Sequence, residues 1–281
     1  MDKHLSNDEK RALQLDELPI LDELDRLAKK HGLQYFITAG TLLGAVRHGG
    51  FIPWDDDIDV VMTTKDYKKL AKLAKTELSE GFFFQDERSE KGYPFFFGKI
   101  RKDGAEVREE ILDVFDIHKG RYIDIFPLSK CPKNPFLANL MFKLVRFYNV
   151  AIVSKNNPAF TLGYTKKAAR LAFRLVSRLP SGFIKWLRRF TVGFFGIFCS
   201  GKRLATVAGN HGYPRETYDA KWFEESVMLT FEGKEYPAPK QWHSLLSSMY
   251  GDYMTPPDEN DRDGHFIKDD NNTNNTYHQG E

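Results

Sequence analysis

Four aspartates fall within five residues, directly before a run of strand-forming residues, and this feature constrains the fold most strongly. They lie in the stretch "GTLLGAVRHGGFIPWDDDIDVVM", residues 40–62, and are Asp55, Asp56, Asp57 and Asp59. Carboxylates this close repel one another unless a positive partner lies among them. Residues two apart on a strand point to the same face, about 7 Å apart, so we predict that Asp57 and Asp59 project together from a buried strand. For Asp55 and Asp56, a solvated turn or a helix cap is the favoured interpretation.

A divalent cation is the predicted positive partner. Paired carboxylates suit Mg²⁺ or Mn²⁺, which prefer hard oxygen ligands. A third carboxylate, Asp124, lies inside the apolar stretch "RYIDIF", where an unpaired charge would be costly. Upstream, a predicted strand ends at Gly40 and a helix begins at Thr41, and the free N–H groups of a helix start can bind phosphate. We therefore predict a metal-assisted phosphate site built from Asp57, Asp59, Asp124 and this turn.

Helical and strand patterns alternate along the first half of the chain, which predicts an α+β fold with a mixed sheet flanked by helices. A Gly-Thr helix start followed by Asp-x-Asp on the next strand is the local pattern of the nucleotidyltransferase fold. The predicted organisation has four parts. These are a catalytic core in residues 1–130, a basic, aromatic-rich helical insertion in 131–215, a C-terminal part in 216–267 that packs back on the core, and a disordered polar tail in 268–281.

The charge distribution is strongly asymmetric. Between Ile125 and Arg215 there are 16 Lys or Arg residues and no Asp or Glu, which leaves 25 basic against all 39 acidic residues elsewhere. The basic side chains Lys166, Arg170, Arg174 and Arg178 recur every four residues, and aromatic residues follow from Phe183 to Phe198. This pattern favours an interfacial helix pair, so 131–215 is predicted to contact an anionic membrane. A soluble helical subdomain with a solvated basic rim is the alternative, and a nucleic-acid surface is least favoured.

The remaining features favour the cytoplasm. The N-terminal residues are charged, without the apolar stretch of a signal peptide, and the two cysteines have no ligand-like spacing. The longest apolar run, Phe190 to Ser200, is too short to span a bilayer. We therefore expect a cytoplasmic protein that is peripheral at the inner face of the cell membrane and binds no nucleic acid.

The stretch 40–62 resembles the signature of the LicD family of phosphocholine transferases, bacterial relatives of the fukutin-type phosphosugar transferases. The resemblance continues through "KHGLQYFITAGTLLG", "FGKIRKDG", "YIDIFPL" and "YGDYMTPPDENDRDGH", and covers most of residues 16–130 and 236–265. It implies a nucleotidyltransferase-like fold. It also implies transfer of phosphocholine from CDP-choline to a sugar hydroxyl of a cell-surface glycan or its lipid-linked precursor, with release of CMP, as in teichoic acid or lipopolysaccharide biosynthesis. Two departures are Ala105, where the family tends to carry Thr, and the segment 131–215, which matches no family motif.

On this resemblance, Asp57, Asp59 and Asp124 match the metal carboxylates, and Gly40 and Thr41 match the phosphate turn. Asp124 is either a metal ligand or the general base. Two other functions stay open. The same site could transfer another CDP-activated group, such as ethanolamine, glycerol or ribitol phosphate, or the protein could be a catalytically silent membrane scaffold. The intact aspartates argue against the scaffold.

Several basic residues near these motifs are candidate phosphate contacts. They are Arg47, His48, Lys99 and Arg101, of which Arg47 and Lys99 are favoured. Trp54 either packs against the acidic turn and positions it, which is the favoured interpretation, or forms one wall of a choline cage by cation–π attraction.

Overall fold

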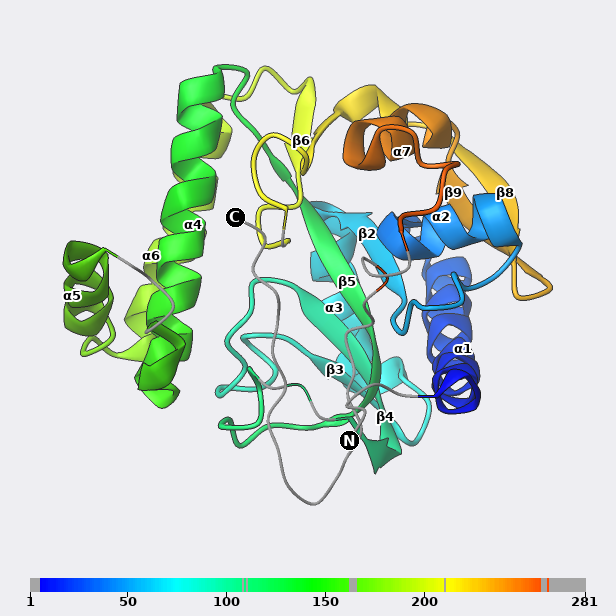
Figure 1. Cartoon of the computed structure of the whole chain (residues 1–281), viewed down its shortest axis with the longest axis horizontal. Helices are drawn as coiled ribbons and strands as arrows, with labels where there is room; N and C mark the ends of the chain where they lie inside the picture. The colour runs from blue at the N-terminus through cyan, green and yellow to red at the C-terminus, as the bar shows by residue number, and fades with distance from the viewer. Residues whose placement is uncertain are drawn as a thin grey trace.

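A mixed sheet runs through the middle of the molecule with helices on either side, so the predicted α+β fold class is confirmed (Figure 1). The computed structural model describes residues 6–107, 109, 111–161, 166–209, 211–258 and 262. The polar tail 268–281 and part of the C-terminal motif therefore lie outside the described residues.

Seven strands form the main sheet, and a two-stranded hairpin lies beside it. The strand order is β1-β2-β5-β4-β3, with β6 paired to β5 and β7 paired to β6. The β2–β5 pair is parallel, and every other strand pair described is antiparallel. The strands are β1 (Tyr35–Ile37), β2 (Asp59–Thr63), β3 (Phe82–Gln85), β4 (Gly98–Glu106), β5 (Gly120–Lys130), β6 (Arg203–Ala205), β7 (Thr217–Asp219), β8 (Ser226–Phe231) and β9 (Lys234–Pro239).

Helix α1 (Asn7–His31) provides much of the main core. It begins at a capping box in which Ser6 and Glu9 exchange hydrogen bonds, and it ends at Gly32, whose φ of 59° suits a residue without a Cβ. Its apolar face is fully buried and contains Ile20, Leu21, Leu24 and Leu27. Together with α3 (Thr64–Glu77), it packs against the central strand β5.

The elements around the acidic stretch begin at different residues from those predicted. Helix α2 (Ala39–His48) begins before Thr41, so Gly40 lies in its first turn rather than at the end of β1. Asp57 precedes β2, because the chain is still leaving the turn closed by the Asp55 N–H and the Ile52 carbonyl. The strand begins only at Asp59, where both β1 and β5 are in position to pair with it.

The segment between β5 and β6 is helical, as predicted, and its helices stand together at one side of the molecule (Figure 1). They are α4 (Pro135–Asn156), α5 (Lys167–Val176) and α6 (Ser181–Ile197), with a short 3₁₀ helix at Pro158–Thr161. Helices α4 and α6 pack together over a second apolar cluster that includes Met141, Phe142 and Phe195.

One helix in the described part of the chain, α4, is long and apolar enough to cross a membrane by length and composition. A segment long enough to cross a membrane was not expected here from the sequence, because Lys143 and Arg146 interrupt the apolar run. In the structure 44% of its most apolar window is buried. Ala138, Met141 and Val145 supply the inward face that packs into the second cluster.

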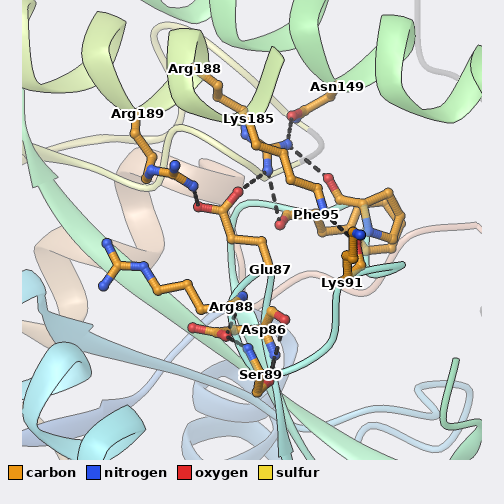
Figure 2. Close-up of polar contacts among 11 residues, drawn as sticks. Asp86, Glu87, Arg88, Ser89, Lys91, Phe95, Asn149, Lys185, Arg188 and Arg189 are labelled. Atoms are coloured by element: carbon orange, nitrogen blue, oxygen red, sulfur yellow. Dashed lines mark hydrogen bonds and ion pairs between the residues drawn. The ribbon is translucent and has the colours of Figure 1, made fainter. Parts of the chain in front are cut away.

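Helix α6 is joined to the core by a buried ionic contact (Figure 2). Glu87, in the loop after β3, accepts hydrogen bonds from Arg188 and Arg189, at 2.8 and 2.7 Å. The buried Arg188 guanidinium also donates to the carbonyls of Pro94 and Phe95 and to the Asn149 side chain of α4. Lys185 donates to the Lys91 carbonyl. Arg188 and Lys185 are therefore buried and engaged with the protein, while Arg189 bonds Glu87 but stays partly exposed.

The C-terminal part returns to the N-terminal elements. Helix α7 (Trp242–Tyr250) packs against α2, and β9 lies beside β1. A 3₁₀ helix at Ala220–Phe223 precedes the β8–β9 hairpin. At the tip of that hairpin, Glu232 bonds both the Arg11 guanidinium and the Phe51 N–H.

Candidate functional site

The three predicted carboxylates come together where β2 and β5 begin to pair. Asp59 and Asp124 are partners in the parallel register, and the Asp124 N–H donates to the Ile58 carbonyl at 2.8 Å. Asp57 reaches the same place from the preceding loop, and one carboxylate oxygen from each of the three residues lies within 4.8 Å of the others. Three oxygen donors this close form a plausible site for a small divalent cation.

The electrostatics of this cluster favour a cation. Burial, and then the charges of Asp57 and Asp124, raise the pKa of Asp59 well above its usual value. Burial also raises the pKa of Asp124 to about 6, although Lys99 opposes the shift. Each shift means that the ionised carboxylate is destabilised in its present surroundings. A bound cation would remove that cost.

Lys99 lies on the neighbouring strand β4 and is the main counter-charge of Asp124. Its ammonium is 2.7 Å from Asp124 Oδ1 and 3.2 Å from Glu109 Oε2, and it lies 3.2 Å from the centroid of the Tyr122 ring. Lys99 is therefore at the site, as predicted, but in this structure it contacts carboxylates. It would reach a phosphate only by changing partners.

Arg101 is not a phosphate contact, and that part of the prediction is wrong. Its buried guanidinium donates to Gln85, Glu109 and the Gly120 carbonyl. Burial favours the neutral form of Glu109, but Lys99 and Arg101 outweigh it and hold the pKa of Glu109 below its usual value. The sequence pattern gave no sign of Glu109, because it lies between strands in a segment without periodicity.

The first turn of α2 positions the carboxylates. The Thr41 hydroxyl accepts a hydrogen bond from the Asp59 N–H at 2.8 Å. A Cβ on Gly40 would lie 2.2 Å from Asp55 Oδ2, so glycine permits the close approach of that carboxylate. Ala39 has a φ of 46°, a left-handed conformation that is unusual for a residue with a Cβ. Such conformations cluster at functional sites.

Arg47 and His48 lie at the other end of α2. The Arg47 guanidinium donates to the Tyr253 carbonyl at 2.8 Å and lies 5.8 Å from the Trp54 ring centroid. The Arg262 guanidinium is closer to that ring, at 4.7 Å. Trp54 also packs against the main core, and the His48 ring meets its edge. Trp54 therefore packs as expected, and two guanidinium groups of the same chain lie over its ring; the choline-cage role stays a prediction.

Three residues near the acidic stretch were misjudged or missed. Asp56 is fully buried, so the solvated-turn interpretation is wrong for it. Glu17 of α1 is also fully buried, and neither of its oxygens has a hydrogen-bond partner among the described residues. Burial, followed by the charges of Asp57 and Asp56, raises the pKa of Glu17 well above its usual value. Tyr250 of α7 is 37% exposed as a whole residue, but burial around its hydroxyl and the Asp59 charge raise its pKa. The sequence did not single out Glu17, because it is one of many charged residues along the amphipathic helix α1.

This geometry agrees with a comparison against known families. The model of the LicD/FKTN/FKRP nucleotidyltransferase domain matches residues 32–140. The chain carries a LicD-family nucleotidyltransferase domain. The matched LicD segment contains the α2 turn, Lys99 and the three clustered aspartates, so the predicted family is confirmed.

Similar proteins extend the LicD resemblance beyond that segment. Lipopolysaccharide cholinephosphotransferase LicD of Haemophilus influenzae is 28% identical over 260 residues, which are 92% of this chain and 96% of that protein. An uncharacterised protein of Rickettsia prowazekii is 28% identical over 53% of this chain and 52% of its own length. Ribitol 5-phosphate transferase FKRP of Mus musculus and of Homo sapiens is 33% identical over 76 residues, 22% of this chain and 15% of that protein. The prediction of a LicD-type phosphotransferase is thus confirmed at the level of the family.

Proposed function

We propose that this LicD-type enzyme transfers phosphocholine from CDP-choline to a sugar hydroxyl of a cell-surface glycan or its lipid-linked precursor. The observation that carries the proposal is similarity over nearly the full length of both chains to a lipopolysaccharide cholinephosphotransferase. The hydroxyl oxygen would form a bond to the phosphorus that bears choline. The bond from that phosphorus to the bridging oxygen would break, and CMP would leave.

Asp57, Asp59 and Asp124 would hold Mg²⁺ or Mn²⁺, since their oxygens lie together and burial disfavours the ionised forms of Asp59 and Asp124. The bound cation would neutralise the diphosphate and lower the pKa of the attacking hydroxyl. Asp124 would serve either as a ligand or as the acceptor of the hydroxyl proton. Lys99 would keep the Asp124 carboxylate ionised in either role.

The first turn of α2 would bind the donor phosphates. Thr38, at the start of this helix, makes no side-chain capping hydrogen bond, so its own side chain does not compete for the N–H groups that would meet a phosphate. Gly40 and Thr41 lie in this turn, directly against the acidic cluster. Arg47, at the far end of α2, would act through the surface that it shares with Trp54, where a choline ammonium could replace an arginine over the ring.

Transfer of ribitol phosphate is the second candidate, favoured by the 33% identity to FKRP. That similarity covers 22% of this chain, compared with 92% for the cholinephosphotransferase. We further propose that the enzyme works in the cytoplasm at the inner face of the membrane, where a lipid-linked acceptor would be available. The 16 basic residues without an acid between Ile125 and Arg215 support this location.

A donor panel tests the proposal. Purified protein is incubated with Mn²⁺ or Mg²⁺, with a panel of soluble acceptor sugars, and with CDP-choline, CDP-ethanolamine, CDP-glycerol or CDP-ribitol, and release of CMP is measured. CDP-choline is expected to give the fastest release. Faster release from CDP-ribitol would move the assignment to the second candidate, and no release from any donor would favour a silent scaffold.

A further inference from the structure

Helix α6 carries a row of exposed aromatic rings along its outer face. Phe183, Trp186, Phe190 and Phe194 are between 45% and 56% exposed. Their rings stack in sequence, with centroids 5.7, 5.5 and 6.1 Å apart. Because they recur at three- and four-residue spacing, they lie on one side of the helix. Ile197, on the same side, extends the apolar surface and is also exposed.

The opposite side of α6 is already occupied by the protein. Ile184, Arg188, Thr191 and Phe195 are buried there, and Arg188 forms the ionic contact with Glu87 (Figure 2). Rotating α6 to hide the aromatic row would pull this guanidinium from four acceptors. The fold therefore keeps the aromatic row of α6 exposed to solvent. A contiguous exposed apolar surface of this kind marks an interaction site.

Helix α5, which packs against α4, adds charge and more apolar surface to the same helical segment. It is fixed to α4 by Phe173, whose ring stacks on Phe147 with centroids 5.1 Å apart. Its exposed residues include Lys167, Leu171, Arg174 and Leu175, and Arg178, just after the helix, is also exposed. Every charged side chain between Ile125 and Arg215 is basic.

We infer that the outer faces of α5 and α6 dock the enzyme on an anionic lipid bilayer, with the α6 rings inserted at the headgroup level. Aromatic and aliphatic side chains flanked only by cations are the composition of interfacial helices. A second copy of the chain would bring two positive surfaces together, which disfavours self-association through this face. The inference rests on the proposed function in one respect only: a lipid-linked acceptor would explain why the enzyme binds a membrane.

Vesicle co-sedimentation of the full chain tests the inference. Vesicles of phosphatidylcholine alone are compared with vesicles rich in phosphatidylglycerol. The test variant combines Phe183→Ser, Phe190→Ser and Phe194→Ser. Its matched control combines Leu15→Ser, Val114→Ser and Met228→Ser. These substitutions remove similarly exposed apolar side chains outside helices α4, α5 and α6. A second variant, Arg174→Gln with Arg178→Gln, removes charge only.

The wild type and the apolar control should bind anionic vesicles, and the aromatic variant should bind about tenfold or more weakly, because the apolar area it would bury is lost. The arginine variant should lose about fivefold per residue, and high salt should mimic this loss. Brominated lipids should quench wild-type tryptophan fluorescence but not that of Trp186→Phe. Equal binding of the aromatic variant and the wild type would overturn the inference. So would a solution dimer that the aromatic variant abolishes, which would assign the row to self-association.

Release of CMP from CDP-choline with a soluble acceptor sugar, measured without vesicles, separates the two proposals. The aromatic variant should release CMP at the wild-type rate while binding vesicles poorly. Vesicle binding without CMP release would leave the docking surface in place and remove the proposed function. If the wild type releases CMP but binds no vesicles, the proposed function stands and the docking surface is ruled out.

Discussion

Asp59 is held in place by its neighbours, but its ionised carboxylate is destabilised when no cation is bound. Its N–H is bonded to Thr41, its carbonyl accepts from Thr38, and its carboxylate faces Asp57 and Asp124. The backbone thus keeps the charge where solvation and neighbouring carboxylates disfavour it. Such local conflict is expected where structure serves binding rather than stability.

Neutralising Asp59 should therefore stabilise the metal-free protein. At pH 8 without divalent ions, Asp59→Asn should melt about 2 to 4 °C above wild type, which corresponds to roughly 1 kcal/mol in a chain of this size. Asp124→Asn should gain less or lose stability, because it removes the 2.7 Å partner of the buried Lys99. Thermal melts with and without Mn²⁺ measure both, and only wild type should gain from Mn²⁺. An Asp59→Asn protein that melts below the metal-free wild type would contradict this electrostatic account.

Thr41 should act by positioning Asp59. Thr41→Val removes the acceptor of the partly buried Asp59 N–H, which should cost about 1 to 3 kcal/mol of unfolding free energy and weaken Mn²⁺ binding. Thr41→Ser keeps the oxygen and should restore both. Urea unfolding and Mn²⁺ titration followed by electron paramagnetic resonance provide the two readouts. If Val and Ser behave alike, the hydroxyl has no positioning role.

At the scale of elements, the attachment of α6 to the core depends on one buried guanidinium. Arg188→Ala would leave the Glu87 carboxylate with Arg189 alone and strip the carbonyls of Pro94 and Phe95 of a donor. We expect a loss of about 3 to 5 kcal/mol in unfolding free energy. Arg189→Ala is the matched control, since Arg189 is partly exposed and bonds only Glu87 among the contacts described, and it should cost about 1 kcal/mol. Urea unfolding distinguishes them, and equal losses would show that burial of Arg188 does not matter.

The loop between β6 and β7 should make stability depend on pH through Glu216. Burial raises the pKa of Glu216 to about 7, although the N–H groups of His211 and Gly212 donate to it. Because the pKa of Glu216 in the folded protein lies above the ordinary glutamate value of 4.5, its contribution to stability is complete below pH 4.5 and is lost as the pH rises to 7.

Glu216→Gln does not titrate, so the free-energy advantage of wild type over Glu216→Gln should shrink by roughly 3 kcal/mol across that window. Urea unfolding of both proteins at pH 4.5, 6 and 8 measures it. A difference that stays constant with pH would show that Glu216 has an ordinary pKa.

Periodicity and caps predicted most elements, but contacts between distant segments could not be predicted. The capping box at Ser6, the helical segment after β5 and the central strand with Asp124 follow from local patterns. The parallel register that sets Asp59 beside Asp124 depends on how the sheet assembles. Glu17 and Glu109 reach the site or its support only through tertiary packing, which no spacing along the chain reveals.

Across the whole molecule, charge separates into two regions with different proposed tasks. The acidic stretch between α2 and β2 would hold a cation and a nucleotide, while the cationic helices α4 to α6 stand at the side and would face an anionic surface (Figure 1). The contact of Glu87 with Arg188 and Arg189 couples these regions through buried side chains. A lipid-linked acceptor would then be presented to a catalytic centre at a fixed position relative to the membrane.

The central claim is that Asp57, Asp59 and Asp124 form a cation-dependent centre for phosphocholine transfer. CMP release from CDP-choline with a soluble acceptor sugar and saturating Mn²⁺ tests it most directly, comparing wild type, Asp59→Asn and the exposed-carboxylate control Glu225→Gln. We predict cation-dependent release by wild type and control, and a loss of about 100-fold or more in a folded Asp59→Asn protein, as expected for removal of a major electrostatic stabiliser. Release by Asp59→Asn at the wild-type rate, or release that persists unchanged after removal of divalent ions with a chelator, would contradict the account.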